Sequence, residues 1–317
     1  MTVLNSLAAS LAFLGRHGTR AVAASIFVGL LLAPLATTFK PYLGEAIFVL
    51  LVAAFMRVDL SDMRMLLRSP GLVLAAVLWV MIVVPVLLGT LVLALGIDDV
   101  SPGLYFILIL QVCAPALMSS PALARMIGLD VPLTLASMLL CTALAPLTAS
   151  FFTYLFLGAA LIDPLNFGFT LFLLIGGSAA VAGLIRLFAG HSFVETHSER
   201  IDGLSVLAMC VFAVAAMEGI TGHAIASPIT VIGLTILAFA IALGLIAATT
   251  LIFIKAGRER AFAIGVLAGN RNIGVLLAAA GFAAPDLAWL YFGLAQFPIY
   301  LLPALLKLVA ERYVASR

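Results

Sequence analysis

Charged residues are scarce in this sequence: Asp, Glu, Lys and Arg make up only 9% of its 317 residues, against about 25% in soluble domains. Hydrophobic residues make up 65%. A soluble protein of this length needs a polar surface, and this chain lacks the residues to build one. The composition therefore predicts that lipid surrounds most of the protein. The formal net charge is only +2 and the basic residues form no patch, so we expect no nucleic-acid partner.

Residues that mark metal sites, disulfides or catalysis are also few. The three cysteines, Cys113, Cys141 and Cys210, lie inside apolar runs and form no CxxC pair, which predicts neither a disulfide framework nor a zinc site. None of the four histidines stands at metal-ligand spacing from a carboxylate or a cysteine, and the chain contains no HExxH, GxSxG or Walker motif. We therefore expect no metal, no cofactor and no enzymatic activity.

Long apolar runs are what the sequence has in abundance. A membrane-spanning helix needs about 20 predominantly apolar residues, and these runs are too long, and alternate too little, to be strands. We identify ten candidate spans, separated by Pro, Gly and charged residues: 21–38, 42–57, 70–96, 102–127, 131–157, 166–188, 203–220, 228–255, 258–284 and 286–310. The sequence thus predicts an all-α polytopic membrane protein with ten transmembrane helices, preceded by a cytoplasmic or interfacial segment at residues 1–20.

The basic residues sort between the two sides of the predicted membrane. Ten spans place both termini on one side, and every Lys and Arg falls on that side except Lys40 and Arg271. The opposite side receives Lys40 together with the acidic loop residues. By the positive-inside rule, both termini are predicted to be cytoplasmic, and we expect the protein in a bacterial inner (cell) membrane.

The ten predicted helices divide into two sets of five, residues 21–157 and 158–317. Because five is odd, the two sets enter the membrane with opposite orientation, as in an inverted repeat. The fourth helix is interrupted at Cys113–Pro121 and the ninth at Gly265–Gly274, at the same place in each set. Paired interruptions of this kind point to a binding site at the midplane. We therefore predict that helices four and nine are broken and cross at their breaks.

Prolines and hydroxyls mark the interruption of the fourth helix. Pro121 cannot donate a helix hydrogen bond, and it disfavours helical dihedrals for Ser120. Pro115 adds a second break. Backbone carbonyls are therefore freed beside the hydroxyls of Ser119 and Ser120, which makes these four residues candidates for binding, although a plain proline kink is the alternative for this segment taken alone.

A cation marks the interruption of the ninth helix. Arg271 lies between Asn270 and Asn272 in the middle of an apolar run, where a charged side chain costs at least about 2.5–3.5 kcal/mol. No apolar core contains an evident acidic partner. Two compatible interpretations remain open: Arg271 holds carbonyls freed in the fourth helix, or it offers positive charge to an anionic substrate. At the end of the seventh helix, Glu218 and His223 could couple transport to protons, or they are solvated loop residues.

These segments resemble the bile acid:sodium symporter family. The resemblance rests on three places: Phe55–Asp62 with Arg68–Pro70 and Val84–Pro85, Cys113–Asp130 with Ala145–Pro146, and Gly269–Gly274. It implies a ten-helix fold in which a panel domain (helices 1, 2, 6 and 7) works against a core domain (helices 3–5 and 8–10). It also implies that the substrates are organic anions.

Most of the side chains that bind the family's two sodium ions are missing here. In the alignment with the family, Leu267 stands at a Glu position and Arg271 at a Gln position of helix nine. Three further ligand positions are occupied by Pro121, Met138 and Val80, and the remaining hydroxyls are Ser120 and Thr134. Arg271 puts a fixed positive charge where a cation would sit. The resemblance therefore implies a divergent member that does not bind sodium.

Taken together, the sequence predicts a sodium-independent secondary transporter of a small organic anion, working by alternating access with Arg271 in place of the sodium charge. Two alternatives remain: a proton-coupled or facilitative exporter of a neutral or weakly acidic solute, and a non-transporting membrane sensor. The expected partners are a small anionic molecule and the lipid bilayer. The sequence predicts neither the substrate's identity nor the oligomeric state.

Overall fold

The computed structural model of the chain is built from helices. It describes residues 18–58, 70–159, 161–190, 196–282 and 284–315. These ranges contain no strand; the one extended pairing in them is an isolated antiparallel bridge between Ala116 and Arg271. The protein is therefore all-helical, and with its apolar composition it is a helical membrane protein.

Six helices in the described ranges are long and apolar enough to cross a membrane, judged by length and composition. They are Pro34–Met56, Pro70–Ala94, Val131–Leu157, Pro164–Ala189, Ser198–Ala226 and Pro228–Ile252. The predicted fourth, ninth and tenth spans are each divided into two shorter helices. The total of ten spans and their arrangement as an inverted repeat thus stay predictions.

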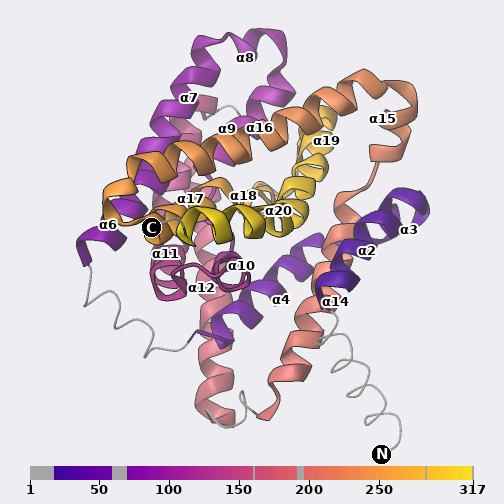
Figure 1. Ribbon diagram of the computed structural model, residues 1–317. Coiled ribbons are helices and arrows are strands. Elements are labelled where there is room, and N and C mark those ends of the chain that lie inside the picture. The colour runs from indigo at the N-terminus through magenta and orange to yellow at the C-terminus, as the bar shows by residue number, and fades with distance from the viewer. Residues whose placement is uncertain (1–17, 59–69, 160, 191–195, 283, 316–317) are drawn as a thin grey trace, which may run out of the picture. The chain divides into compact units, whose positions relative to one another are not determined.

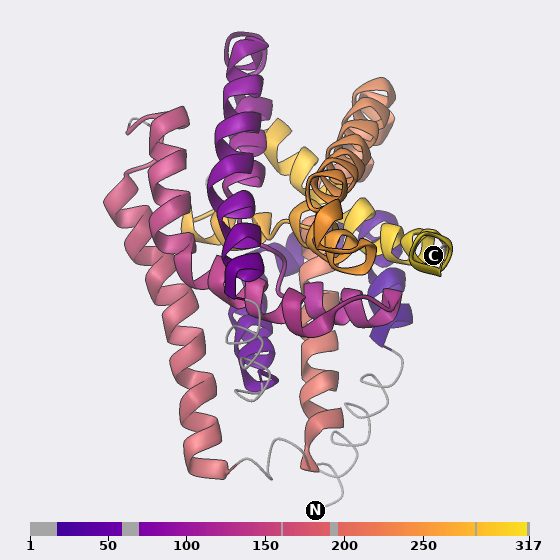
Figure 2. The ribbon, with the colours of Figure 1, turned by 60° about the vertical axis from the view of Figure 1, so that its left-hand side comes forward.

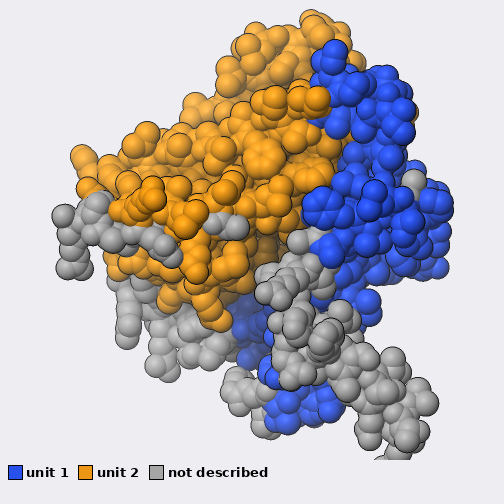
Figure 3. Space-filling view, turned by 45° about the vertical axis from the view of Figure 1, so that its right-hand side comes forward, with its two compact units in different colours: residues 1–58, 173–231 blue, residues 59–172, 232–317 orange. Residues whose placement is uncertain are grey.

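The chain folds into two compact units, each made of two separate stretches of sequence (Figure 3). The first unit has residues 1–58 and 173–231, and the second has residues 59–172 and 232–317. Two of the three boundaries fall inside helices, one in α12 (Pro164–Ala189) and one near the start of α16 (Pro228–Ile252). Each of these two helices is therefore shared between the units.

In the first unit, α14 (Ser198–Ala216) packs against α2 (Gly18–Leu31), α3 (Ala33–Phe39) and α4 (Leu43–Met56), as Figure 1 shows. The short helix α15 (Ile220–Ala226) follows. A Cβ on Gly29 would lie 2.9 Å from the Met217 Cβ atom and from the Val214 carbonyl oxygen. Glycine at this position is what lets α2 approach α14 so closely.

The boundary between the first two predicted helices was placed wrongly. We expected it between residues 38 and 42, but the chain stays helical there through a 3₁₀ turn, Lys40–Tyr42, in which Pro41 sits near the start, where its missing N–H costs little. The break lies instead at Leu32, whose dihedrals (φ −117°, ψ 66°) are not helical. Pro34 follows two residues later, and its ring cannot continue the preceding helix.

In the second unit, α6 (Pro70–Leu78), the π-helical turn η2 (Trp79–Val83) and α7 (Val84–Ala94) form one continuous column, the purple helix of Figure 2. The other elements of this unit, besides its parts of α12 and α16, are α8 (Ile97–Val100), α9 (Pro102–Cys113), α10 (Ser120–Ile127), α11 (Val131–Leu157), η3 (Ile254–Ala256), α17 (Arg258–Gly269), α18 (Ile273–Ala279), α19 (Asp286–Leu294) and α20 (Gln296–Ala315).

Apolar side chains from α10, α16, α17 and α20 form a buried core cluster in the second unit. Ile246, Phe262 and Leu302 are among its members. The helices α16 and α17 come especially close, because Gly265 and Gly269 face α16: a Cβ on Gly269 would lie 2.8 Å from the Ala242 carbonyl oxygen. This packing fixes the end of α17, which leads directly into the interrupted segment.

Candidate functional site

Two broken segments meet in the second unit. The first lies between α9 and α10, and the second between α17 and α18. The Leu117 N–H donates to the Asn270 carbonyl and the Asn272 N–H donates to the Pro115 carbonyl, both at 2.9 Å, on either side of the Ala116–Arg271 bridge. Each break therefore satisfies backbone groups of the other, which an apolar environment requires of any non-helical backbone.

The residues around each break explain where the helices stop. Ala114 precedes Pro115 and is extended (φ −65°, ψ 145°), as a residue before proline prefers. Pro121 falls in the first turn of α10, where its missing N–H costs nothing. Asn270 ends α17, and its side-chain Nδ2 donates to the Val266 carbonyl at 2.8 Å. The side chain thus bonds a carbonyl of the helix end.

Arg271 is at the centre of this crossing. It is among the largest fully buried side chains of the described residues, with 2% of its surface exposed. Its Nη1 donates to the Ala114 carbonyl at 2.8 Å and to the Val80 carbonyl at 2.9 Å. The sequence allowed two interpretations of Arg271. The bond from Nη1 to the Ala114 carbonyl agrees with the first, in which Arg271 holds carbonyls that are freed in the fourth helix.

The second acceptor, the Val80 carbonyl, lacks both its α-helical and its π-helical backbone donor. In the π-helical turn, the Val84 N–H donates to the Trp79 carbonyl, five residues back, and so leaves the Val80 carbonyl that it would bond in an α-helix. The π-helical donor for Val80 would be residue 85, and Pro85 has no N–H. The carbonyl of Val80 is therefore free to accept from Arg271.

The opposite edge of the guanidinium is unpaired. Arg271 Nε and Nη2 are buried and have no hydrogen-bond partner within the described residues, and no carboxylate in those ranges forms an ion pair with Arg271. The buried hydroxyls of Ser120 and Ser137 are unpaired in the same sense. Buried polar groups are nearly always hydrogen-bonded, so each of these exceptions calls for an explanation.

The helix α11 packs beside the same break. Thr142 donates to the Met118 sulfur at 3.5 Å, and the buried Cys141 thiol lies close to the backbone of Ala116. Ser137 lies one turn before Cys141, on the same face of α11. This face therefore adds a buried thiol to the neighbourhood of the crossing, with an unpaired hydroxyl one turn away.

Three positions at which the sequence predicts that sodium ligands are missing are buried and apolar. Leu267 and Val80 have no exposed surface and Met138 has 2%. None of their side chains contains an oxygen, whereas hard cations are bound by several oxygen ligands.

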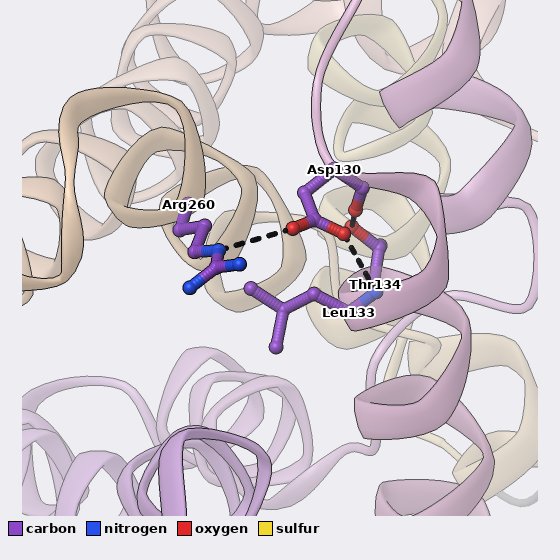
Figure 4. A network of polar contacts seen from close by, with 4 residues as sticks. All are labelled: Asp130, Leu133, Thr134 and Arg260. Atoms are coloured by element: carbon purple, nitrogen blue, oxygen red, sulfur yellow. Dashed lines mark hydrogen bonds and ion pairs between the residues drawn. The ribbon is translucent and has the colours of Figure 1, made fainter. Parts of the chain in front are cut away.

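Thr134 takes part in a helix cap. Asp130 precedes α11 and accepts from the Leu133 N–H at 3.0 Å, while the Thr134 hydroxyl donates to the Asp130 carbonyl at 2.7 Å (Figure 4). Arg260, from α17, donates its Nε–H to the Asp130 carboxylate at 3.3 Å. The hydroxyl of Thr134 is thus bonded within the cap.

Glu218 and His223 belong to the first unit, whereas the crossing belongs to the second. Glu218 accepts from the Lys40 Nζ at 3.0 Å, in a half-exposed ion pair. His223 Nδ1 lies 2.9 Å from the Gly219 carbonyl, one turn earlier. Ser119 is half-buried and immediately precedes α10, and Asn272 precedes α18; neither caps its helix with its side chain.

The sequence analysis missed one buried polar pair in the second unit. The Tyr291 hydroxyl of α19 donates to the Gln111 Oε1 atom of α9 at 2.6 Å, and both side chains are buried. Gln111 precedes the end of α9 by two residues. The polar side chain of Gln111 inside the predicted span 102–127 was the sequence signal that could have identified this pair.

Comparisons with known proteins identify neither a family nor a function for this chain. The function of this chain has to be inferred from its own residues. A search against protein-family models finds no match, and a search of curated proteins also finds none.

Proposed function

We propose that this protein is a secondary transporter of a small organic anion, and that it works without sodium. The observation that carries the proposal is the buried Arg271 at the crossing of two broken segments, with one edge of its guanidinium unpaired within the described residues. A buried cation without a carboxylate partner is costly in a membrane. An anionic substrate would supply the missing charge and the missing acceptors.

The electrostatics oppose a sodium ion at this place. A sodium ion about 4 Å from a guanidinium would be repelled by roughly 4 kcal/mol at an effective dielectric constant of 20. The apolar side chains of Leu267, Met138 and Val80 offer nothing to offset that repulsion. Arg271 stays protonated at any physiological pH. It would therefore supply permanently the positive charge that bound sodium supplies in the bile acid:sodium symporter family.

The proposed fold is the one implied by the resemblance to the bile acid:sodium symporter family. The ten helices would form two inverted repeats in a bacterial inner membrane, with both termini in the cytoplasm. The first compact unit would be the panel, since its ranges hold the predicted helices 1, 2 and 7 and most of helix 6. The second would be the core, since it holds helices 3–5 and 8–10. Alternating access would move one unit against the other.

Uptake into proteoliposomes tests the proposal. Vesicles containing the protein are incubated with an equimolar mixture of acetate, benzoate, taurocholate, acetamide and benzamide, and their contents are measured by mass spectrometry. We expect anions but not the neutral amides to accumulate, equally in sodium and in choline, and we expect Arg271→Ala to abolish the accumulation. Uptake that depends several-fold on sodium, or that favours the amides, would contradict the proposal.

A double variant probes the charge replacement itself. Arg271→Gln together with Leu267→Glu restores an amide and a carboxylate at the two positions of helix nine. We expect this variant to gain a dependence of melting temperature on sodium but not on potassium, because a carboxylate and an amide oxygen are suitable sodium ligands. Leu267→Gln combined with Arg271→Gln is the control, since it adds oxygens without negative charge.

A further inference from the structure

The guanidinium of Arg271 uses its donors unevenly. A guanidinium has five N–H donors in a rigid plane. The two on Nη1 are directed to the carbonyls of Val80 and Ala114. The three on Nε and Nη2 are buried and have no partner in the described part of the chain. Within the side chain, the used donors and the unused donors are therefore separated.

The unused donors form one edge of the plane. The N–H of Nε and the nearer N–H of Nη2 point in the same direction, and their spacing matches the two oxygens of a carboxylate. The two bonds made by Nη1 fix the plane of the group, because their acceptors belong to different segments of the backbone. The free edge is therefore held in one orientation before any ligand arrives.

The charge of the site limits the ligand. Arg271 is the one Lys or Arg among the buried residues that the structure describes. A single positive charge balances a monoanion such as a carboxylate, and it leaves a dianion such as a phosphate monoester with excess negative charge in a buried setting. Two further buried hydroxyls are unpaired, those of Ser120 at the start of α10 and Ser137 on α11, and a hydroxyl can donate to the carboxylate lone pairs that the guanidinium does not use.

We infer that the Nε and Nη2 edge of Arg271 binds the carboxylate of a monocarboxylic acid side-on, with Ser120 and Ser137 as additional donors. This inference rests on the proposed transport function and specifies the chemical group that the site recognises. Nη1 remains on the protein carbonyls and keeps the plane fixed. Since Arg271 is 2% exposed, the edge becomes accessible when the segments around it separate, and a bound carboxylate is enclosed when they close.

Nuclear magnetic resonance on the wild-type protein tests the geometry directly. The protein is labelled with ¹⁵N-arginine and studied in detergent, and the Nε–H signal of Arg271 is assigned by its absence in Arg271→Lys. Choline acetate, choline benzoate, choline chloride and acetamide are titrated separately. We expect either carboxylate to move the Arg271 Nε proton downfield to a saturating value, and chloride and acetamide to leave it in place. No shift with acetate or benzoate, or an equal shift with chloride, overturns the inference.

Transport by two variants separates this inference from the transport function. Arg271→Lys keeps the positive charge but replaces the planar edge by a single ammonium group. We expect it to lose at least tenfold in acetate and benzoate uptake while its melting temperature stays near that of the wild type. Ser137→Ala should weaken uptake about two- to tenfold.

Full uptake by Arg271→Lys, with none by Arg271→Ala, would mean that charge alone matters, which refutes the side-on site but keeps the transporter. Conversely, a carboxylate-dependent shift of the Arg271 signal without any uptake keeps the site and refutes the transporter.

Discussion

Replacing Gly269 by alanine tests the close packing that fixes the crossing. A Cβ at this position would lie 2.5 Å from the Ile246 Cγ1 atom and 2.8 Å from the Ala242 carbonyl oxygen, where ordinary contact is 3.4–4 Å. The side chain of Ile246 can rotate, but the Ala242 carbonyl belongs to the backbone of α16. The two helices must therefore move apart. Overpacking of this kind costs about 1–3 kcal/mol.

The displacement should reach the crossing, because Gly269 directly precedes Asn270, whose carbonyl accepts from the Leu117 N–H. We expect Gly269→Ala to lower the melting temperature in detergent by roughly 2–4 °C for each kcal/mol, the scale found for domains of 150–250 residues. Uptake of organic anions should fall as well, since the position of Arg271 depends on the same backbone.

Gly244→Ala is the matched control. Gly244 lies on α16, and a Cβ there would meet no atom within 4 Å. In a helix, alanine is favoured over glycine by roughly 0.5–1 kcal/mol, so this variant should be as stable as the wild type or slightly more so. If Gly269→Ala and Gly244→Ala melt at the same temperature, the close approach of α16 and α17 is not a constraint, and the reasoning above is wrong.

Three further predictions concern other parts of the chain. Asp130→Ala should destabilise the protein by about 0.5–2 kcal/mol in thermal unfolding, because it removes the cap of α11, whereas Asp130→Asn should keep the cap and lose only the exposed pair with Arg260. Trp79→Phe should cost about 0.5–1.5 kcal/mol by the same measurement, since it removes the 2.9 Å hydrogen bond from the indole to Thr249; a variant as stable as the wild type would mean that the bond contributes nothing. A reporter fused after Arg317 should be active in the cytoplasm, and periplasmic activity would refute the predicted topology.

The breaks of the fourth and ninth segments could be predicted because residues unsuited to an apolar helix mark each of them. Pro115 and Pro121 remove N–H groups, and Arg271 brings a charge that lipid does not accommodate. The Val80 acceptor could not be predicted in the same way. Pro85 signals that one carbonyl lacks its donor, but that carbonyl belongs to Met81 in an α-helix and to Val80 in a π-helical turn. The choice between them is made by packing, which the local sequence does not specify.

Other residues were ambiguous for similar reasons. Pro34 and Pro41 both occur near the first two predicted helices, and only the structure reveals that a 3₁₀ turn accommodates the second. Thr134 was predicted to be a binding residue, yet a threonine in the first turn of a helix can equally bond the backbone behind it, as it does here. Which of the five donors of Arg271 are used depends on distant segments, so the unpaired edge was also beyond prediction.

The pairing of the two breaks also sets an order for biosynthesis. Arg271 and the Ala114 carbonyl that it bonds are separated by 157 residues, so at about 5–20 residues per second the ribosome needs about 8–30 s to pass from one to the other. During that interval the backbone groups at Pro115–Leu117 have no partner from the ninth segment, and lipid offers none. We expect the insertion machinery to hold the fourth segment until the ninth emerges, and a chain truncated after Ile252 to be degraded within minutes in a pulse-chase experiment.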